Sequence, residues 1–190
     1  PAPGRAQTGT YCRIALVLAL DVSASVDAAE YDLQRKGLAA ALLAPRVRKA
    51  ILDGPGSVAI TAFEWSGMGR HADILDWTLL TDLPALERPA AVIARSTRSE
   101  TEFPTGLGSA LGYGATRLAR GPDCARRTID VSGDGVQNQG FPPASAYRAF
   151  DFRGVTVNGL VVSGAPENVQ GYYRNEVIRG PGAFVEIAEG

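Results

Sequence analysis

Five oxygen-bearing side chains fall in three short segments that together could bind a divalent cation. One segment, Asp21-Val22-Ser23-Ala24-Ser25, places an acidic residue and two serines at alternate positions. The other two segments contain Thr105, which precedes Gly106, and Asp134. Carboxylate and hydroxyl oxygens are the ligands that a hard cation takes when it also keeps several waters. Asp and Ser are also common in turns and at helix starts, so the residue types alone do not establish a site.

The placement of these segments along the chain strengthens the prediction. Arg13 to Leu20 is an apolar run typical of a strand buried on both faces of a parallel sheet, and Asp21 follows it directly. Asp134 likewise follows a predicted strand, Thr128 to Val131, and Thr105 precedes a predicted helix. In a doubly wound sheet, functional groups gather beyond the carboxyl ends of the strands, where the strand order reverses. We therefore expect the three segments to meet at one edge of a sheet.

Strands and helices alternate along the rest of the chain. Further strands are predicted over 57–63, 73–80, 155–162 and 183–187, and helices over 27–44, 47–52, 144–150 and 169–178, with another that begins at Asp82. The strand at 73–80 follows the previous one too closely for a helix between them, so we expect it to be an antiparallel edge strand. The pattern predicts one α/β domain over residues 13–190, a Rossmann-like doubly wound, mostly parallel six-stranded sheet, after a flexible segment over 1–12.

The composition is that of a soluble globular protein. The 19 Lys and Arg residues are balanced by 20 Asp and Glu residues, giving a net charge of −1. Phosphate binding relies on clustered positive charge, so we expect no nucleic-acid partner. The longest apolar run, Ile14 to Leu20, is far shorter than the roughly 18 residues that a membrane helix needs, so we expect no membrane span within this chain.

The candidate metal residues and several longer stretches resemble a known family. Asp21-x-Ser23-x-Ser25, Thr105-Gly106 and Asp134-Gly135 resemble the metal-ion-dependent adhesion site (MIDAS) of von Willebrand factor A (vWA) domains. The predicted order of elements, including the antiparallel third strand, is similar to the vWA fold over nearly the whole chain. Four stretches most resemble a group of uncharacterised exported bacterial proteins with this fold: Glu64-Trp65, Ile129 to Gly135, Asn138-Gln139-Gly140 and Gly180 to Phe184.

This resemblance implies a metal-dependent protein-binding module. In such a site Ser23, Ser25 and Thr105 coordinate Mg²⁺ directly, whereas Asp21 and Asp134 coordinate it directly or through water. The remaining position is filled by an Asp or Glu carboxylate of a partner protein. Oxygen ligands alone do not distinguish Mg²⁺ from Mn²⁺ or Ca²⁺.

Four residues are candidates for a rim around the metal that the partner contacts. Glu64 and Trp65 end the second predicted strand at the same edge as the metal segments, and Glu102 and Asn138 lie in neighbouring loops. An ordinary strand end would account equally well for Glu64 and Trp65.

The two cysteines bear on the cellular compartment. If the first and fourth strands are adjacent and parallel, as in the family that this chain resembles, Cys12 and Cys124 lie at the edge of the sheet opposite the metal. Neighbouring strands are about 4.8 Å apart, and a disulfide needs Cα atoms within about 7 Å, so we predict a bridge. Two unpaired thiols of a cytosolic protein are the alternative. A bridge would indicate export, and Pro1 to Thr10 would suit the stretch left after removal of a signal peptide, so we expect a periplasmic or secreted protein.

Three other features of the sequence allow further interpretations. Asp130 lies within a buried strand, so it needs a hydrogen-bonded or charged partner, and an ion pair with an arginine is favoured over a catalytic role. His71 lies between strands and is expected in an exposed loop. Tyr172, Tyr173 and Arg174 form a cluster that could contact a ligand, although packing of one tyrosine ring against the sheet is the expected arrangement.

Enzymatic interpretations of the same residues have less support from the sequence, but they remain open. A Mg²⁺-dependent hydrolase or phosphatase would need a general base, for which Glu64 and Glu102 are the nearby candidates. Aspartyl phosphotransferases resemble Asp-x-Asp, but the second position here is Ser23. A serine hydrolase needs a late histidine, whereas the only histidine, His71, comes early. A scaffold whose site binds no metal is a further alternative.

Overall fold

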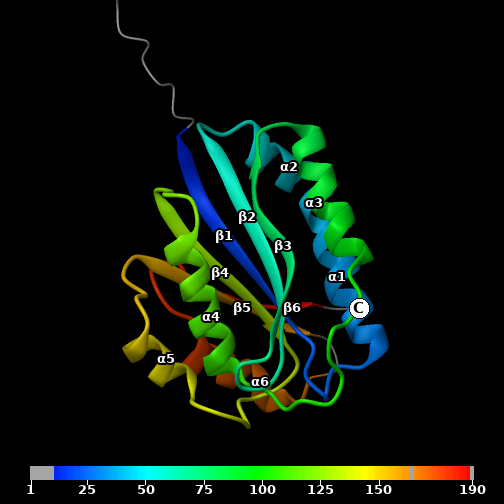
Figure 1. Cartoon of the computed structure of the whole chain (residues 1–190), viewed down its shortest axis with the longest axis vertical. Helices are drawn as coiled ribbons and strands as arrows, with labels where there is room; N and C mark the ends of the chain where they lie inside the picture. The colour runs from blue at the N-terminus through cyan, green and yellow to red at the C-terminus, as the bar shows by residue number, and fades with distance from the viewer. Residues whose placement is uncertain (1–10, 163–164, 189–190) are drawn as a thin grey trace, which may run out of the picture.

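The computed structural model of the chain describes residues 11–162 and 165–188. Within those residues, a six-stranded sheet lies between two layers of helices (Figure 1). The strands are β1 (Cys12–Asp21), β2 (Ser57–Trp65), β3 (His71–Leu80), β4 (Arg126–Gly133), β5 (Val155–Val162) and β6 (Val185–Ala188). The helices are α1 (Ala28–Leu43), α2 (Pro45–Leu52), α3 (Leu83–Arg95), α4 (Leu107–Arg120), α5 (Pro143–Ala149) and α6 (Glu167–Tyr172), followed by one turn of π-helix, η1 (Tyr173–Val177).

The sheet has the strand order β3-β2-β1-β4-β5-β6. The pair β2–β3 is antiparallel and the other neighbouring pairs are parallel. The chain builds outward from β1 to β2 and β3, then returns to place β4 on the other side of β1. The point at which the strand order reverses therefore lies between β1 and β4, which is the adjacency that the resemblance implied.

Alternating side chains of the strands form a core on each face of the sheet. On one face, Leu18 and Leu20 of β1 pack with Leu86 and Ile93 of α3. On the other face, Val17 of β1 packs with residues of α4 and β4. Figure 1 shows α1, α2 and α3 on one side of the sheet and α4 and α5 on the other. The central strands read as continuous apolar runs because both of their faces are covered.

The local signals for helix α1 are confirmed. Asp27 forms a capping box with Glu30: its side chain accepts the backbone N–H of Glu30, and the Glu30 side chain accepts the N–H of Asp27. Pro45 stands at the start of α2, where its missing N–H costs nothing, and separates α2 from α1.

The disulfide prediction is confirmed. Cys12, the first residue of β1, and Cys124, two residues before β4, are bonded, with Cα atoms 4.6 Å apart. Cys12 therefore belongs to the ordered sheet and not to a flexible segment. The rest of the predicted flexible segment, residues 1–10, lies outside the described residues.

Two residues differ from their expected environments. Asp130 has the hydrogen-bonded partner that its burial requires, because the parallel register of β4 and β5 pairs it with Asn158, whose Nδ2 donates to Asp130 Oδ1 at 2.8 Å. The favoured ion pair with an arginine is not formed among the described residues. His71 is the first residue of β3 and not part of an exposed loop. Its ring stacks on Tyr113, with centroids 4.4 Å apart, and its Nε2 lies 3.2 Å from Ser109 Oγ. Burial lowers the pKa of His71.

In the described part of the chain, no helix combines the length and the apolar character needed to cross a membrane.

Candidate metal centre

The three oxygen-bearing segments meet at the carboxyl ends of β1 and β4. Asp21 ends β1, Asp134 directly follows β4, and Thr105 lies two residues before α4. Ser25 Oγ donates a hydrogen bond of 2.7 Å to Asp134 Oδ1, and it lies 3.3 Å from Ser23 Oγ. Thr105 Oγ1 lies 3.5 Å from Ser23 Oγ. Residues far apart in the sequence therefore form one connected cluster.

Asp21 lies at the buried base of this cluster. Its side chain is fully buried, and its Oδ1 accepts the backbone N–H of Ser23 at 2.7 Å. Its Oδ2 is also buried but has no hydrogen-bond partner among the described residues. Burial raises the pKa of Asp21 to about 7, and the nearby Asp134 carboxylate contributes to the increase. A charged Asp21 is thus poorly stabilised by the protein groups alone.

Ser25 connects the cluster to solvent. Ser23, Thr105 and Asp134 are buried, whereas Ser25 and its neighbour Ala24 are exposed. The polar oxygens therefore line a site that is closed at the sheet and open at the surface.

Thr105 is held by the loop that follows Asp134. Its backbone N–H donates to Asn138 Oδ1 at 2.8 Å, and its carbonyl oxygen accepts the N–H groups of Asn138 and Gln139, each at 3.1 Å. Gln139 Oε1 also accepts the N–H of Met68, at 2.8 Å, which ties this loop to the β2–β3 turn. The side chain of Asn138 is thus committed to positioning Thr105, although the residue as a whole is exposed.

Arg98 stabilises the first segment and was not singled out by the sequence. Its Nη2 donates to the carbonyl oxygens of Ser23 at 2.7 Å and Val22 at 3.1 Å. No sequence signal identifies it, because Arg98 lies in an irregular connection whose path is decided only by tertiary packing.

The four residues expected at the rim divide into two pairs. Glu102 and Asn138 are exposed. Glu102 precedes Phe103, whose carbonyl oxygen accepts the N–H of Ala24, and Asn138 bonds to Thr105, so both adjoin the cluster. Glu64 and Trp65 are 2% and 1% exposed and lie inside the protein, because β2 extends two residues beyond its predicted end and is buried along its full length.

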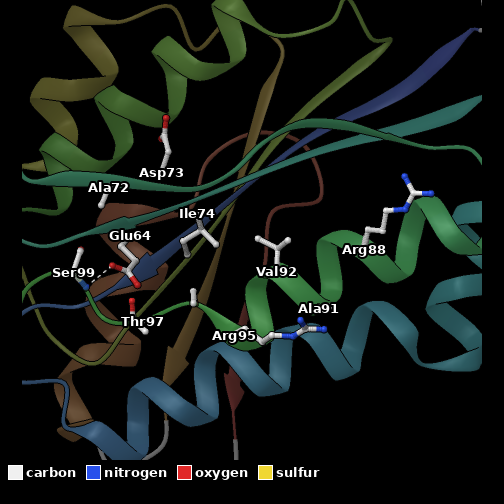
Figure 2. A pocket seen from close by; sticks show the side chains of 11 residues that line it. Glu64, Ala72, Asp73, Ile74, Arg88, Ala91, Val92, Arg95, Thr97 and Ser99 are labelled. Atoms are coloured by element: carbon white, nitrogen blue, oxygen red, sulfur yellow. Dashed lines mark hydrogen bonds between the residues drawn. The ribbon is translucent and has the colours of Figure 1, made fainter.

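Glu64 acts as an internal anchor in this structure. Figure 2 shows its carboxylate directed at Ser99, whose N–H donates to Glu64 Oε2 at 2.8 Å. The hydroxyl of Tyr31 in α1 donates to the other oxygen. Glu64 also borders a cavity of about 780 Å³ between β3 and α3. Both of its oxygens are engaged, so Glu64 is poorly suited to act as a general base at the candidate metal centre.

The donor set fits a hard divalent cation. It consists of two carboxylates and three hydroxyls, which are oxygen ligands of the kind that Mg²⁺, Mn²⁺ and Ca²⁺ accept. The buried Oδ2 of Asp21 has no hydrogen-bond donor among the described residues, and a bound cation would stabilise its negative charge. The described residues contain no cluster of three or more His, Cys, Asp or Glu side chains, so they offer no classical zinc site.

Solved structures of low sequence identity share the fold. Proximal thread matrix protein 1 (PTMP1) from the mussel byssus has a TM-score of 0.66 at 12% identity, covering 94% of this chain and 44% of that chain. Another PTMP1 structure has a zinc-occupied MIDAS motif. A von Willebrand factor type A protein from Catenulispora acidiphila has a TM-score of 0.64 at 14% identity, covering 94% of this chain and 39% of that chain. BatB from Bacteroides thetaiotaomicron has a TM-score of 0.58 at 17% identity, covering 93% and 91%.

These likenesses establish the fold. The chain spans less than half the length of the PTMP1 and Catenulispora chains. No curated protein matches it in sequence. The family described as "Protein of unknown function (DUF1194)" matches residues 11–190, which is nearly the whole chain. The chain therefore belongs to the DUF1194 family and has a vWA-like fold.

Proposed function

We propose that this chain is a metal-dependent protein-binding module. Asp21, Ser23, Ser25, Thr105 and Asp134 hold Mg²⁺, Mn²⁺ or Ca²⁺, and an Asp or Glu carboxylate of a partner protein completes the coordination. The observation that carries this proposal is the hydrogen-bonded cluster that joins Ser25 to Asp134 and reaches Asp21, whose buried Oδ2 has no partner among the described residues.

The charge balance of the site favours docking of an acidic group. Asp21 and Asp134 supply the only carboxylates of the donor set, and Ser23, Ser25 and Thr105 are neutral. A divalent cation held mainly by hydroxyls and water keeps an affinity for one more anionic oxygen. The exposed Ser25 offers the route by which a carboxylate from outside reaches the cation.

Of the two candidate general bases, Glu64 and Glu102, Glu64 is unavailable, which favours a binding role over a hydrolytic one. Both oxygens of Glu64 accept hydrogen bonds from Tyr31 and Ser99, which leaves this carboxylate unsuited to activate a water. A PTMP1 structure of similar fold has a zinc-occupied MIDAS motif, which supports a divalent cation as the ligand of this fold.

Export is part of the same proposal. The Cys12–Cys124 bridge is of the kind that persists in oxidising compartments, so we place the protein in the periplasm or outside the cell. The partner would then also be an exported or surface protein.

Thermal unfolding with and without cation tests the metal site. At 100 times its dissociation constant, Mg²⁺ or Mn²⁺ stabilises the folded state by about 2.7 kcal/mol relative to chelator. We expect this gain in the wild type and in Asp123→Ala, because Asp123 is exposed and lies outside the cluster. We expect Asp134→Ala to lose it. If Mg²⁺, Mn²⁺ and Ca²⁺ all fail to stabilise the wild type, the proposal is wrong and a metal-free scaffold is the better reading.

Binding of a partner is tested separately. Immobilised wild-type protein should retain an acidic partner from an extract of exported proteins in Mn²⁺ and release it in chelator, whereas Asp134→Ala should retain none. Retention that is equal in Mn²⁺ and chelator would contradict a metal-bridged contact.

A further inference from the structure

A buried tyrosine lies directly beneath the candidate metal centre. Tyr173 is 0% exposed, and its hydroxyl has no hydrogen-bond partner among the described residues. A Cβ atom built on Gly133 would lie 2.5 Å from that hydroxyl and 2.7 Å from Asp21 Oδ2. The tyrosine hydroxyl and the unpaired oxygen of Asp21 therefore border the same small space at the end of β4.

Two glycines on adjacent strands make room for the tyrosine. A Cβ atom on Gly159 of β5 would lie 2.5 Å from Cδ1 of the Tyr173 ring, so the ring crosses β5 at a position where no side chain stands. The hydroxyl continues across β4 at Gly133. Tyr173 is also the residue at which α6 changes to the π-helical turn η1. Single π-helical turns are often found at functional sites.

The chemistry of the hydroxyl suits a donor to Asp21. A phenol hydroxyl carries its proton at neutral pH, so it can donate a hydrogen bond to a carboxylate oxygen. A buried hydroxyl without a partner is costly, and so is a buried carboxylate oxygen without one. A hydrogen bond between the two groups would offset both costs.

We propose that Tyr173 is a positioning residue of the metal centre, whose hydroxyl donates to Asp21 Oδ2, either directly or through one water. The hydrogen bond fixes the Asp21 carboxylate beneath the cation, as partners of metal ligands commonly do. This inference rests on the proposed function, because it assigns Tyr173 a role only if the cluster binds a cation.

The test is Mn²⁺ binding measured by titration calorimetry with the wild type, Tyr173→Phe and Tyr147→Phe. Tyr147 is the matched control, because its hydroxyl donates to the carbonyl oxygen of Val177 at the end of the same π-helical turn. We expect Tyr173→Phe to weaken Mn²⁺ binding by about 10-fold to 100-fold, the usual effect of losing a partner of a metal ligand. Tyr147→Phe should bind Mn²⁺ as the wild type does. Near-ultraviolet circular dichroism in chelator should show all three proteins folded.

The outcomes separate the two proposals. If the wild type binds Mn²⁺ and Tyr173→Phe binds it equally well, the role of Tyr173 is wrong and the metal-binding proposal stands. If the two tyrosine variants weaken binding to the same degree, the effect comes from a loosened η1, and the positioning role is again wrong. If the wild type binds no cation, the proposed function fails and the role of Tyr173 fails with it.

A crystal structure of the wild type with Mn²⁺ tests the role of Tyr173 without any substitution. A Tyr173 hydroxyl bonded to Asp21 Oδ2, or sharing one water with it, supports the inference. A hydroxyl directed to any other group overturns it.

Discussion

The strands β1 and β4 lie side by side, and the interactions between them differ at their two ends. At the amino-terminal end, the Cys12–Cys124 disulfide links them covalently. At the carboxyl end, Asp21 and Asp134 bring two carboxylates close together, and one oxygen of Asp21 has no partner among the described residues. The amino-terminal end is held by a covalent bond, whereas the carboxyl end holds close carboxylates that the proposed cation would stabilise.

This difference suggests how the folded state offsets the cost of burying carboxylates at the carboxyl ends of β1 and β4. Cys12 and Cys124 are separated by 112 residues, and closing a loop of that length stabilises a folded chain by about 4–5 kcal/mol in the chain-entropy model. A buried, partly unpaired Asp21 costs free energy in the absence of a cation. The disulfide supplies stability independent of any cation, which offsets the cost of keeping the buried carboxylates of the proposed metal site at the carboxyl end.

The largest effect is expected from removing the disulfide. Replacing both Cys12 and Cys124 by Ser should lower the free energy of unfolding by about 4 kcal/mol, measured by urea unfolding against the oxidised wild type. The stabilisation by Mn²⁺ should persist in this variant, because the bridge and the candidate metal centre lie at opposite ends of β1. A loss of the Mn²⁺ response would show that the two ends are not independent.

The next effect is expected at the carboxyl end itself. In Gly133→Ala the new methyl group would meet the Tyr173 hydroxyl at 2.5 Å and Asp21 Oδ2 at 2.7 Å. Overpacking of this kind costs about 1–3 kcal/mol and should also abolish the response to Mn²⁺. Urea unfolding in chelator and in Mn²⁺ measures both quantities. Unchanged stability together with normal Mn²⁺ binding would contradict the close packing described here.

A smaller effect is expected between the two ends, at Asp130. Burial raises the pKa of Asp130, and the hydrogen bond from Asn158 only partly opposes this. The folded protein therefore holds a proton on Asp130 more tightly than the unfolded chain, and stability is lost as the pH rises from about 4 through the raised pKa. In Asp130→Asn this loss should be absent, so the variant should gain stability relative to the wild type with increasing pH.

Melting temperatures of both proteins in chelator, from about pH 4 to pH 7, check this prediction. The other titrating groups are common to the two proteins and cancel in the difference. A difference in melting temperature that does not change with pH would mean that Asp130 is ionised in the folded state as easily as in the unfolded chain.

Local signals in the sequence were sufficient for much of the fold. The apolar run of β1 indicated a strand buried on both faces, and the short connection before β3 indicated an antiparallel edge strand. The spacing of Asp27 and Glu30 indicated the start of α1. Each of these features depends on a few neighbouring residues, so a single sequence contains the information. The disulfide needed one further premise, the adjacency of β1 and β4.

The surroundings of the candidate site depend on packing between distant residues, and the sequence reading was incomplete there. Glu64 and Trp65 end a strand, but nothing local shows that the strand end is covered by α1 and the loop that contains Ser99. The position of Arg98 is likewise set by tertiary contacts. One ring of Tyr172-Tyr173 was expected to pack against the sheet, and Tyr173 does so, but nothing local shows that its hydroxyl reaches the end of β4. Gly133 and Gly159 leave space for the Tyr173 side chain, but the sequence shows this only when the register of β4 and β5 is known.

The smallest effect is expected at a glycine that touches neither end of the β1–β4 pair. Gly37 is exposed within α1, and a Cβ atom there would meet nothing within 4 Å. Gly37→Ala should raise the free energy of unfolding by about 0.5–1 kcal/mol, because alanine loses less backbone entropy than glycine on folding. Its response to Mn²⁺ should equal that of the wild type. Gly37→Ala and Gly133→Ala add the same methyl group, so opposite changes in stability would attribute the loss in Gly133→Ala to contacts with Tyr173 and Asp21. Destabilisation by both variants would remove that argument.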